Sequence, residues 1–259
     1  MDPLQGALGK RMNGSSTRAP IIVRLCLLAH KIVRAIALRI LPQQLVNPRT
    51  FSNALLRTHA PHFSGQIINV SGWDDGDKEG EFYRNYFTKK KSYIVSNAKT
   101  AAKGFGAMHG SGIEEIHIDL ARPIGEEHKG AYDVVFNHTT LEHVLNFDQA
   151  FENLCAMSRD AIIIVVPILQ QLHFAEGFGD YWRPTPITVA TLLYKHGFAP
   201  LVIATNDQPF GAVYLFAIGV KNPEKYPNIE PIAKFDMGEA LYGSPVPYAK
   251  LPTLLESLK

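Results

Sequence analysis

Hydrophobic and polar positions in the middle of the chain follow two alternating patterns. Tyr132–His138 is an apolar run with a polar end, residues 146–160 repeat apolar side chains at helical spacing, and Ala161–Pro167 is a second apolar run. Continuous apolar runs are typical of strands that are buried on both faces of a parallel sheet. The pattern therefore predicts a strand–helix–strand unit. Because ligands bind beyond the carboxyl ends of such strands, we expect chemistry at Asn137–His143 and Pro167–His173.

The same two patterns predict further elements on either side of this unit. We expect strands at 66–71, 92–96 and 113–118, helices around Glu79–Tyr86 and at Thr185–His196, and an antiparallel pair formed by Leu201–Thr205 and Ala212–Val220. The glycine-rich stretch 104–112 precedes a strand instead of following one. It therefore lacks the helix N-terminus of a phosphate-binding loop, and a flexible connection is expected there.

The N-terminal part predicts one more helix, over Pro20–Leu41. Its cations fall on one side of the helix: Arg24, Lys31, Arg34 and Arg39. The helix either covers the core of its own domain or lies on an anionic membrane surface as a peripheral contact through residues 20–41. The expected organisation is a mobile segment 1–19, a helical segment 20–62, a main domain 63–221 and a proline-rich tail 222–259 packed on that domain.

Composition narrows the class of protein. The chain has 259 residues, 46% hydrophobic, and a formal charge of +2, which favours an ordinary globular protein and gives no reason to expect a nucleic-acid partner. Cys26 and Cys155 form neither a disulfide framework nor a zinc-binding spacing, so a cytoplasmic setting is the default expectation. No apolar run reaches the length that crosses a bilayer. Oligomeric state is not indicated.

Three short segments carry a family resemblance. Residues 132–135 read YDVV, residues 141–144 read LEHV, and residues 180–186 read DYWRPTP. This wording resembles that of class I S-adenosylmethionine-dependent methyltransferases. The resemblance implies an α/β fold: a Rossmann-like, seven-stranded, mostly parallel sheet with helices on both faces and an antiparallel edge hairpin, preceded here by an N-terminal helix. It also implies S-adenosylmethionine as cofactor.

The resemblance implies a set of cofactor-binding residues at the strand ends. This chain departs from the family pattern in two places. Only Gly72 and Gly76 remain of the family's glycine-rich turn, with bulky Trp73 between them. Asn97 replaces the acid that holds the ribose in the family. An amide lacks the charge that strengthens such hydrogen bonds. The implied cofactor-binding residues are Ser71, Gly72, Asp74, Asn97, Asp119, Leu120, Asn137 and His138, with Asp75 as an alternative to Asp74 for the methionine ammonium. Solvated acids in an ordinary turn, and an Asp119 that caps a helix, are the structural alternatives.

The loop after the fifth strand is expected to face the acceptor. His173 or Tyr181 could act as general base, while Trp182 and Arg183 could bind the substrate; Tyr181 and Trp182 could equally be packing anchors. The acceptor would be a small molecule, a glycan or a lipid-linked compound. His138 and His143 are five residues apart, which is not same-face helical spacing, so no metal site is expected.

Two other functions compete with an active methyltransferase. The missing glycines and Asn97 favour a catalytically inactive protein of the same fold that serves as a scaffold or partner subunit. A nicotinamide dehydrogenase would need G-x-G-x-x-G after the first strand, which residues 71–76 do not supply.

Overall fold

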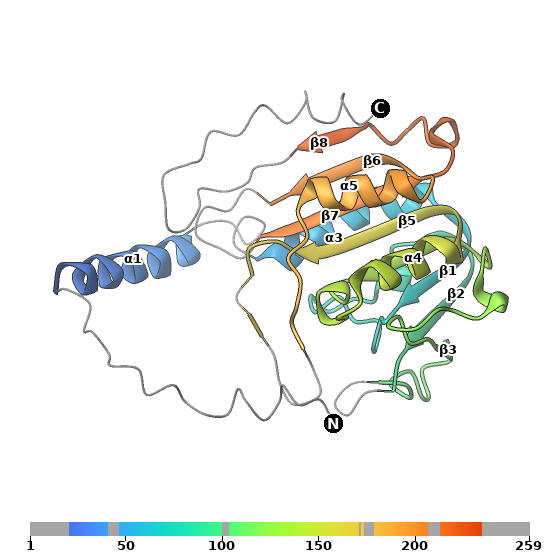
Figure 1. The fold of residues 1–259 in the computed structure, drawn as a ribbon, viewed down its shortest axis with the longest axis horizontal. Coiled ribbons are helices and arrows are strands. Elements are labelled where there is room, and N and C mark those ends of the chain that lie inside the picture. The colour runs from blue at the N-terminus through green and yellow to red at the C-terminus, as the bar shows by residue number, and fades with distance from the viewer. Residues whose placement is uncertain are drawn as a thin grey trace. The chain divides into compact units, whose positions relative to one another are not determined.

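The structure is a computed structural model that describes residues 21–40, 47–99, 104–170, 172–173, 179–206 and 213–234. The chain divides into two units, residues 1–41 and residues 42–259, which are described separately (Figure 1). The expectations for segment 1–19 and for the tail beyond residue 234 fall outside the described residues. The described part of the first unit is the predicted helix, α1 (Ile21–Ile40).

Helix α1 exposes most of its apolar side chains. Ile21, Leu25 and Leu28 are more than half exposed, and so are Ile32 and Ile36 farther along the helix. The cations Arg24, Lys31 and Arg39 are exposed too. Among the described residues, no helix combines the length and the apolar character that crossing a membrane requires.

The second unit is built on one sheet with the strand order β3-β2-β1-β4-β5-β7-β6-β8. Strands β1 to β5 run parallel, β7 runs antiparallel between β5 and β6, and β8 adds a parallel edge beside β6. The first seven strands confirm the predicted mostly parallel sheet with its antiparallel hairpin, and β8 is an addition from the proline-rich tail. The bounds are β1 Ser64–Val70, β2 Lys89–Asn97, β3 Glu114–His117, β4 Tyr132–His138, β5 Ser158–Pro167, β6 Ala199–Thr205, β7 Tyr214–Val220 and β8 Ile232–Lys234.

Local sequence determines where the helices of this unit begin. The bounds are α3 Pro48–His59, α4 Phe147–Met157 and α5 Pro186–Lys195. Asn47, Asn146 and Thr185 precede them, and each side chain accepts a hydrogen bond from a backbone amide of the first turn. Short 3-10 turns lie at residues 60–62, 83–85, 126–128, 141–143 and 223–225.

The helix predicted around Glu79–Tyr86 is wrong. Only the 3-10 turn Tyr83–Asn85 forms there. The backbone amides of Glu79 and Glu81 donate to the Asp77 carboxylate instead of forming a helical ladder, and Gly80 has a φ of +104°. Side-chain hydrogen bonds therefore override the helical spacing of the sequence.

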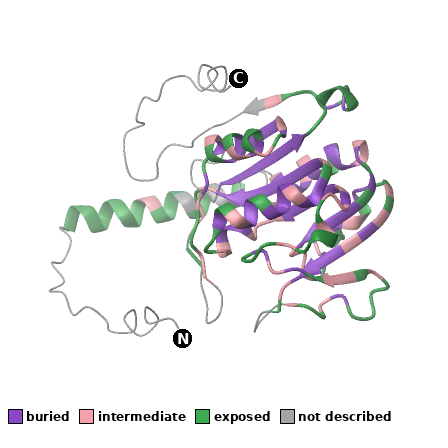
Figure 2. Ribbon diagram, turned by 45° about the vertical axis from the view of Figure 1, so that its right-hand side comes forward, coloured by how far each residue is buried: buried purple, intermediate pink, exposed green. Residues whose placement is uncertain are grey.

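Side chains that alternate along the strands form a core on each face of the sheet. Ile67 points to the layer that contains Leu56 of α3, whereas its neighbour Ile68 points to the layer that contains Leu154 of α4 and Leu193 of α5. Helix α3 thus covers one face, and α4 and α5 cover the other, which confirms the prediction of helices on both faces. Figure 2 shows the central strands as almost continuously buried.

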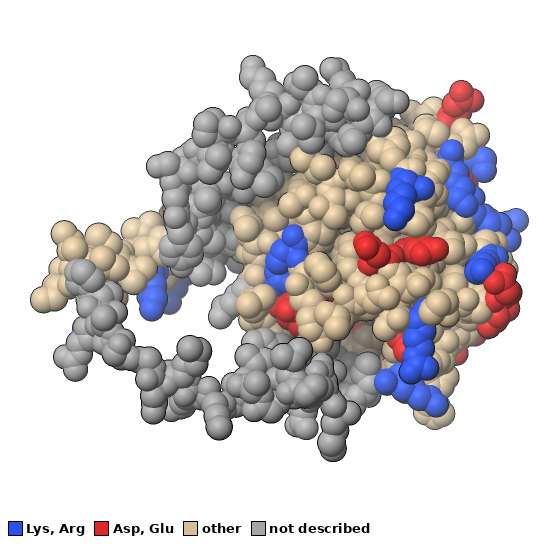
Figure 3. Space-filling view, viewed as in Figure 1, with Lys and Arg blue, Asp and Glu red and all other residues tan. Residues whose placement is uncertain are grey.

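Basic and acidic side chains are interspersed on the face of the molecule shown in Figure 3. The second unit also contains surface pairs of opposite sign, such as Arg159 with Asp133 at 3.2 Å and Lys225 with Asp160 at 3.3 Å. Exposed pairs of this kind contribute little to stability. Interspersed charges give this face no continuous field of one sign.

The two cysteines should differ strongly in reactivity. Cys155 is 3% exposed in α4, and burial raises the pKa of its thiol to about 12, whereas Cys26 on α1 is exposed. Because the thiolate is the reactive form, we expect a thiol reagent to modify one cysteine in the native chain and both in denaturant. A Cys26→Ser variant should then show almost no native reaction. Rapid native modification of that variant would contradict the burial of Cys155.

Candidate functional site at the carboxyl ends of the strands

The turn after β1 has an unusual backbone. Ser71, Trp73 and Asp75 have φ values of 58°, 50° and 62°, and Lys78 follows with 62°. Residues with side chains rarely adopt this left-handed region, and such strain clusters at functional sites. The turn therefore keeps glycine-like conformations although most glycines of the family pattern are absent. The loss of these glycines therefore does not make the turn an ordinary one.

A buried carboxylate organises the inner side of this turn. Asp75 is fully buried and accepts hydrogen bonds from Asn69 Nδ2 (2.8 Å), the Tyr93 hydroxyl (2.7 Å) and the Arg84 backbone amide (3.1 Å). Burial raises the pKa of Asp75, and the three hydrogen bonds oppose this shift. Asp75 thus ties the turn to β1 and β2, and both of its carboxylate oxygens already accept hydrogen bonds from the protein.

A second buried carboxylate, Asp77, closes the outer side. It accepts from the backbone amides of Glu79 (2.7 Å) and Glu81 (2.9 Å), from the Tyr86 hydroxyl, and from Arg57 of α3 at 3.0 Å. Burial opposes ionisation of Asp77, but these hydrogen bonds outweigh it and hold its pKa below the usual range. The run of acids in the sequence therefore fixes the turn from both sides.

Gly72 is needed because the turn approaches β1 closely. A Cβ atom at this position would lie 2.4 Å from Asn69 Nδ2, and the Asn69 side chain is held by Asp75. We expect Gly72→Ala to lower the free energy of unfolding by about 1–3 kcal/mol, because the buried hydrogen bond must break or shift. Gly76→Ala is the matched control, since its nearest contact is the exposed Asp74 side chain at 3.2 Å. Equal urea midpoints for both variants would contradict this reading.

The Asn97 side chain, predicted to hold a ribose hydroxyl, bonds the turn after β1. Its Oδ1 accepts from the Trp73 backbone amide at 2.8 Å. Its Nδ2 donates to the Trp73 carbonyl at 3.1 Å and to Glu115 of β3 at 2.7 Å. Ser96 also bonds the turn, through its carbonyl and the Gly72 amide at 3.2 Å. The structure thus brings Ser71, Gly72 and Asn97 together at the ends of β1 and β2.

Asn137 and His138 lie at the end of β4, next to this turn. Asn137 is fully buried; its Nδ2 donates to the Val70 carbonyl at 2.8 Å, while its Oδ1 has no hydrogen-bond partner among the described residues. An unsatisfied buried acceptor costs about 1–3 kcal/mol. Such an atom at the edge where ligands bind marks the place for a donor from a ligand.

The His138 ring lies on the opposite side of β4, among residues of α3. Its Nε2 is 3.0 Å from Ser52 Oγ, its Nδ1 is 3.4 Å from Arg49, and the ring stacks on Tyr83 at 5.5 Å. Burial lowers the pKa of His138 well below its usual value, and Arg49 adds to the effect. Arg49 also donates to the Tyr83 hydroxyl at 2.8 Å. Sequence reasoning missed Arg49, and only its place in the first turn of a capped helix could have drawn attention to it.

Asp119 and Leu120 follow β3 with different environments. The Asp119 side chain is 41% exposed and accepts from the Ala121 amide at 3.0 Å, so its carboxylate remains accessible. Leu120 is 3% exposed in the core, and its carbonyl accepts from Asn153 of α4 at 3.0 Å. Asp74 is exposed in the turn after β1 and accepts from the Gly76 amide.

The acceptor-side residues form a second group, beyond the ends of β4 and β5. Arg183 makes a two-point ion pair with Asp180, at 2.5 and 2.7 Å, and the Asp180 Oδ2 atom is 3.2 Å from His173 Nδ1. Trp182 donates from Nε1 to the carbonyls of Val144 and Leu145, both at 3.1 Å. These contacts hold the Asp180 and Arg183 side chains together and join the Trp182 ring to the segment after β4.

Other contacts define the space around this group. A cavity of about 380 Å³ lies beside it, lined by residues 145–148, residues 182–185 and Thr188. Tyr181 is 51% exposed, and its backbone amide donates to the Glu142 carbonyl at 2.7 Å. The cavity therefore borders Trp182 and Arg183, while His173 and Tyr181 lie outside its lining.

Glu142 is the most unusual residue of this second group. Its side chain is fully buried, and burial raises the pKa of the carboxyl to about 8. The nearest imidazole, His143, places Nε2 3.6 Å from Glu142 Oε1. His143 Nδ1 is 2.5 Å from the Gly179 carbonyl, to which it donates. The sequence reasoning treated Glu142 as part of a structural triplet and did not single it out.

Comparisons with known proteins found neighbours among solved structures and no relative by sequence. No protein-family model matches the chain. No curated protein matches it in sequence either. A solved structure of Burkholderia thailandensis 1,6-didemethyltoxoflavin-N1-methyltransferase, with bound S-adenosylhomocysteine, is similar at 13% identity and a TM-score of 0.49, over 81% of this chain and 93% of that chain.

Two further structures are similar to the same extent. An S-adenosylmethionine-dependent methyltransferase from Mesorhizobium loti has 11% identity and a TM-score of 0.48, over 64% of this chain and 96% of that chain. Magnesium protoporphyrin IX methyltransferase from Synechocystis PCC 6803 has 12% identity and a TM-score of 0.46, over 78% and 99%. Because these scores are below 0.5, the fold is defined by the strand order of the sheet itself, which agrees with the mostly parallel sheet and edge hairpin that the resemblance implies.

Proposed function

We propose that this chain is an S-adenosylmethionine-dependent methyltransferase. The observation that carries the proposal is the buried Oδ1 atom of Asn137, which has no hydrogen-bond partner among the described residues and lies where β1 and β4 end. The ammonium group of S-adenosylmethionine is a donor that would satisfy this atom. The left-handed turn at residues 71–75 supports the same position for the cofactor.

The other cofactor contacts follow from the strand ends. Ser71, Gly72 and Asp74 would hold the methionine part, and the accessible Asp119 carboxylate would accept from the adenine amino group. Asn97 would bind a ribose hydroxyl only after releasing the Trp73 backbone. The bound cofactor supplies an electrophilic methyl group on a sulfonium. Asn137 and the turn would orient that group toward the second group of residues, so positioning supplies most of the catalysis.

Acceptor chemistry belongs to the second group. His173 or Tyr181 would take the proton of a hydroxyl acceptor as a lone pair of its oxygen attacks the methyl carbon and the carbon–sulfur bond breaks. A small molecule fits the cavity of about 380 Å³ beside Trp182 and Arg183. The proposal of a glycan or lipid-linked acceptor is supported only by the exposed apolar and basic side chains of α1. Binding of the chain to anionic vesicles, lost on replacing Arg24, Lys31 and Arg39 together, would test that extension.

A second function is favoured by a specific contact. Asn97 bonds Trp73 through both Oδ1 and Nδ2, so its side chain is occupied by the protein's own turn and is not available to a ribose hydroxyl. A chain that never releases this contact would be a catalytically inactive scaffold or partner subunit with a methyltransferase fold.

Hydrogen exchange with and without S-adenosylhomocysteine separates the two functions. An active site predicts slower exchange of the amides of residues 69–76, 96–98 and 119–121 when ligand is present. Asn137→Leu replaces the amide with an apolar side chain of similar size, which removes the unpartnered acceptor together with the hydrogen bond to Val70. This variant should abolish that protection. Unchanged exchange in the wild-type chain at saturating ligand would favour the scaffold.

A further inference from the structure

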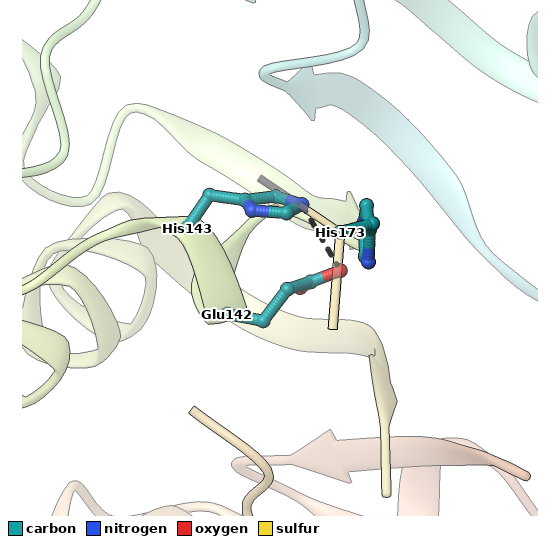
Figure 4. A group of neighbouring side chains, drawn as sticks. All are labelled: Glu142, His143 and His173. Atoms are coloured by element: carbon teal, nitrogen blue, oxygen red, sulfur yellow. Dashed lines mark ion pairs between the residues drawn. The ribbon is translucent and has the colours of Figure 1, made fainter. Parts of the chain in front are cut away.

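We propose that Glu142, His143 and His173 form a binding site for one divalent transition-metal ion of the zinc class. Each residue offers one ligand atom, and these atoms lie within 4.8 Å of one another (Figure 4). Glu142 and His143 come from the 3-10 turn after β4, and His173 comes from the loop after β5. Two imidazoles and one carboxylate are the ligand set of one type of catalytic zinc site. Magnesium and calcium prefer oxygen ligands throughout.

The strongest evidence is the isolation of the Glu142 carboxylate. Its side chain is fully buried, and neither oxygen has a hydrogen-bond partner among the described residues. Carboxylates in such surroundings are normally paired, hydrogen-bonded or coordinated to a metal. Figure 4 shows this carboxylate pointing toward both imidazoles. A cation shared by the three side chains would satisfy it.

Both imidazoles are oriented by partners of the kind that support metal ligands. His143 donates from Nδ1 to the Gly179 carbonyl at 2.5 Å, which turns Nε2 toward Glu142. His173 lies with Nδ1 3.2 Å from Asp180 Oδ2, and Arg183 fixes Asp180 in turn. A backbone carbonyl or a carboxylate on the second ring nitrogen is the usual outer partner of a metal-bound histidine.

One pair of ligand atoms already has the spacing of a metal site, and the third lies within 4.8 Å of both. Two ligands at about 2.0–2.2 Å from a tetrahedral zinc ion lie roughly 3.3–3.6 Å apart. His143 Nε2 and Glu142 Oε1 are 3.6 Å apart, and the His143 and His173 ring centroids are 4.9 Å apart. His173 is 42% exposed, which gives an ion a path from solvent. Three protein ligands would leave a fourth position open. With the ion bound, His173 would have no free ring nitrogen, so the general-base role of the proposed function would fall to Tyr181.

Metal titration of the full chain, purified without a polyhistidine tag and without any methyl donor, tests this site independently of the proposed function. We expect one Zn²⁺ per chain by calorimetry. Co²⁺ should give the visible absorption of a low-symmetry site, and excess Zn²⁺ should abolish it. Mg²⁺ at the same concentration should produce no heat. A folded wild-type chain that binds no Zn²⁺, or a Co²⁺ spectrum like that of the free hydrated ion, would overturn the proposal.

Variants locate the ion. His173→Ala removes a half-exposed ligand and should weaken Zn²⁺ binding by more than about 100-fold, since even outer partners cost 10–100-fold. Glu142→Gln, which keeps the size of the buried side chain, should weaken it as strongly. His109→Ala removes an exposed imidazole outside the cluster and is the matched control. Equal Zn²⁺ affinity for His173→Ala and His109→Ala, both folded by circular dichroism, would overturn the assignment.

Discussion

Replacing Phe136 with alanine is expected to lower the free energy of unfolding by about 3–5 kcal/mol. Phe136 is fully buried on β4, the central strand between β1 and β5. Its ring packs against Tyr83 at 5.1 Å and Phe87 at 6.0 Å, both from the segment between β1 and β2. The substitution would leave a cavity beneath that segment. The segment itself is irregular apart from the 3-10 turn Tyr83–Asn85. Urea denaturation gives the measurement.

Phe105→Ala is the matched control for this prediction. Phe105 is 46% exposed, so its loss should change the free energy of unfolding by less than about 0.5 kcal/mol. A loss under 1 kcal/mol for Phe136→Ala would contradict the placement of Phe136 in the core. Because Tyr83 also stacks on His138, the variant should weaken any ligand binding that depends on the end of β4.

Replacing Asp77 with alanine should lower the free energy of unfolding by about 3 kcal/mol at neutral pH. The change leaves the amides of Glu79 and Glu81 and the Tyr86 hydroxyl without their acceptor, and each such loss costs about 1–3 kcal/mol when buried. Arg57 adds little, since its side chain is 42% exposed. Asp74→Ala, in the same turn but exposed, should be nearly neutral.

The pH dependence of this effect follows from the lowered pKa of Asp77. A carboxyl group with a folded-state pKa below its unfolded value stabilises the fold above the unfolded pKa, about 3.9 for Asp. That contribution is lost as the pH falls through the folded-state value. The difference in unfolding free energy between wild type and Asp77→Ala should therefore be full at pH 7 and shrink below about pH 4. A difference that stays constant down to pH 3 would contradict the account.

Much of the fold could be predicted from the sequence, because the signals were long and periodic. The apolar runs at β4 and β5 and the helical spacing of α4 define a buried strand–helix–strand unit within a few residues of its observed bounds. The hairpin of β6 and β7 followed from two apolar runs with no helix between them. Strand β8 has only three residues, Ile232–Lys234, which is too short to give a periodic signal.

The segment between β1 and β2 could not be predicted in the same way. Its conformation depends on side chains that are distant in sequence: Asn97 holds Trp73, Tyr93 holds Asp75, and Arg57 reaches Asp77. Propensity and periodicity describe neighbours along the chain, so they predicted a helix near Glu79–Tyr86. The positive φ values of Ser71 and Trp73 depend on the same distant contacts.

For the candidate site, too, some residues could be predicted from the sequence and others could not. Residue types at strand ends located Asn137, Asn97 and Asp119, since the topology of a parallel sheet brings such ends to one edge. The isolation of the Glu142 carboxylate and the position of Arg49 were not visible, because burial and partners are properties of the folded chain.

Calorimetric titration with S-adenosylmethionine and with S-adenosylhomocysteine tests the central claim most directly. The account predicts one-to-one binding with a dissociation constant on the order of micromolar, weakened in Asn137→Leu and in Asp119→Ala. Both variants must first be shown to fold by circular dichroism. Absence of binding heat from either ligand up to about 1 mM, in a folded wild-type chain, would contradict a cofactor site at the ends of β1 and β4.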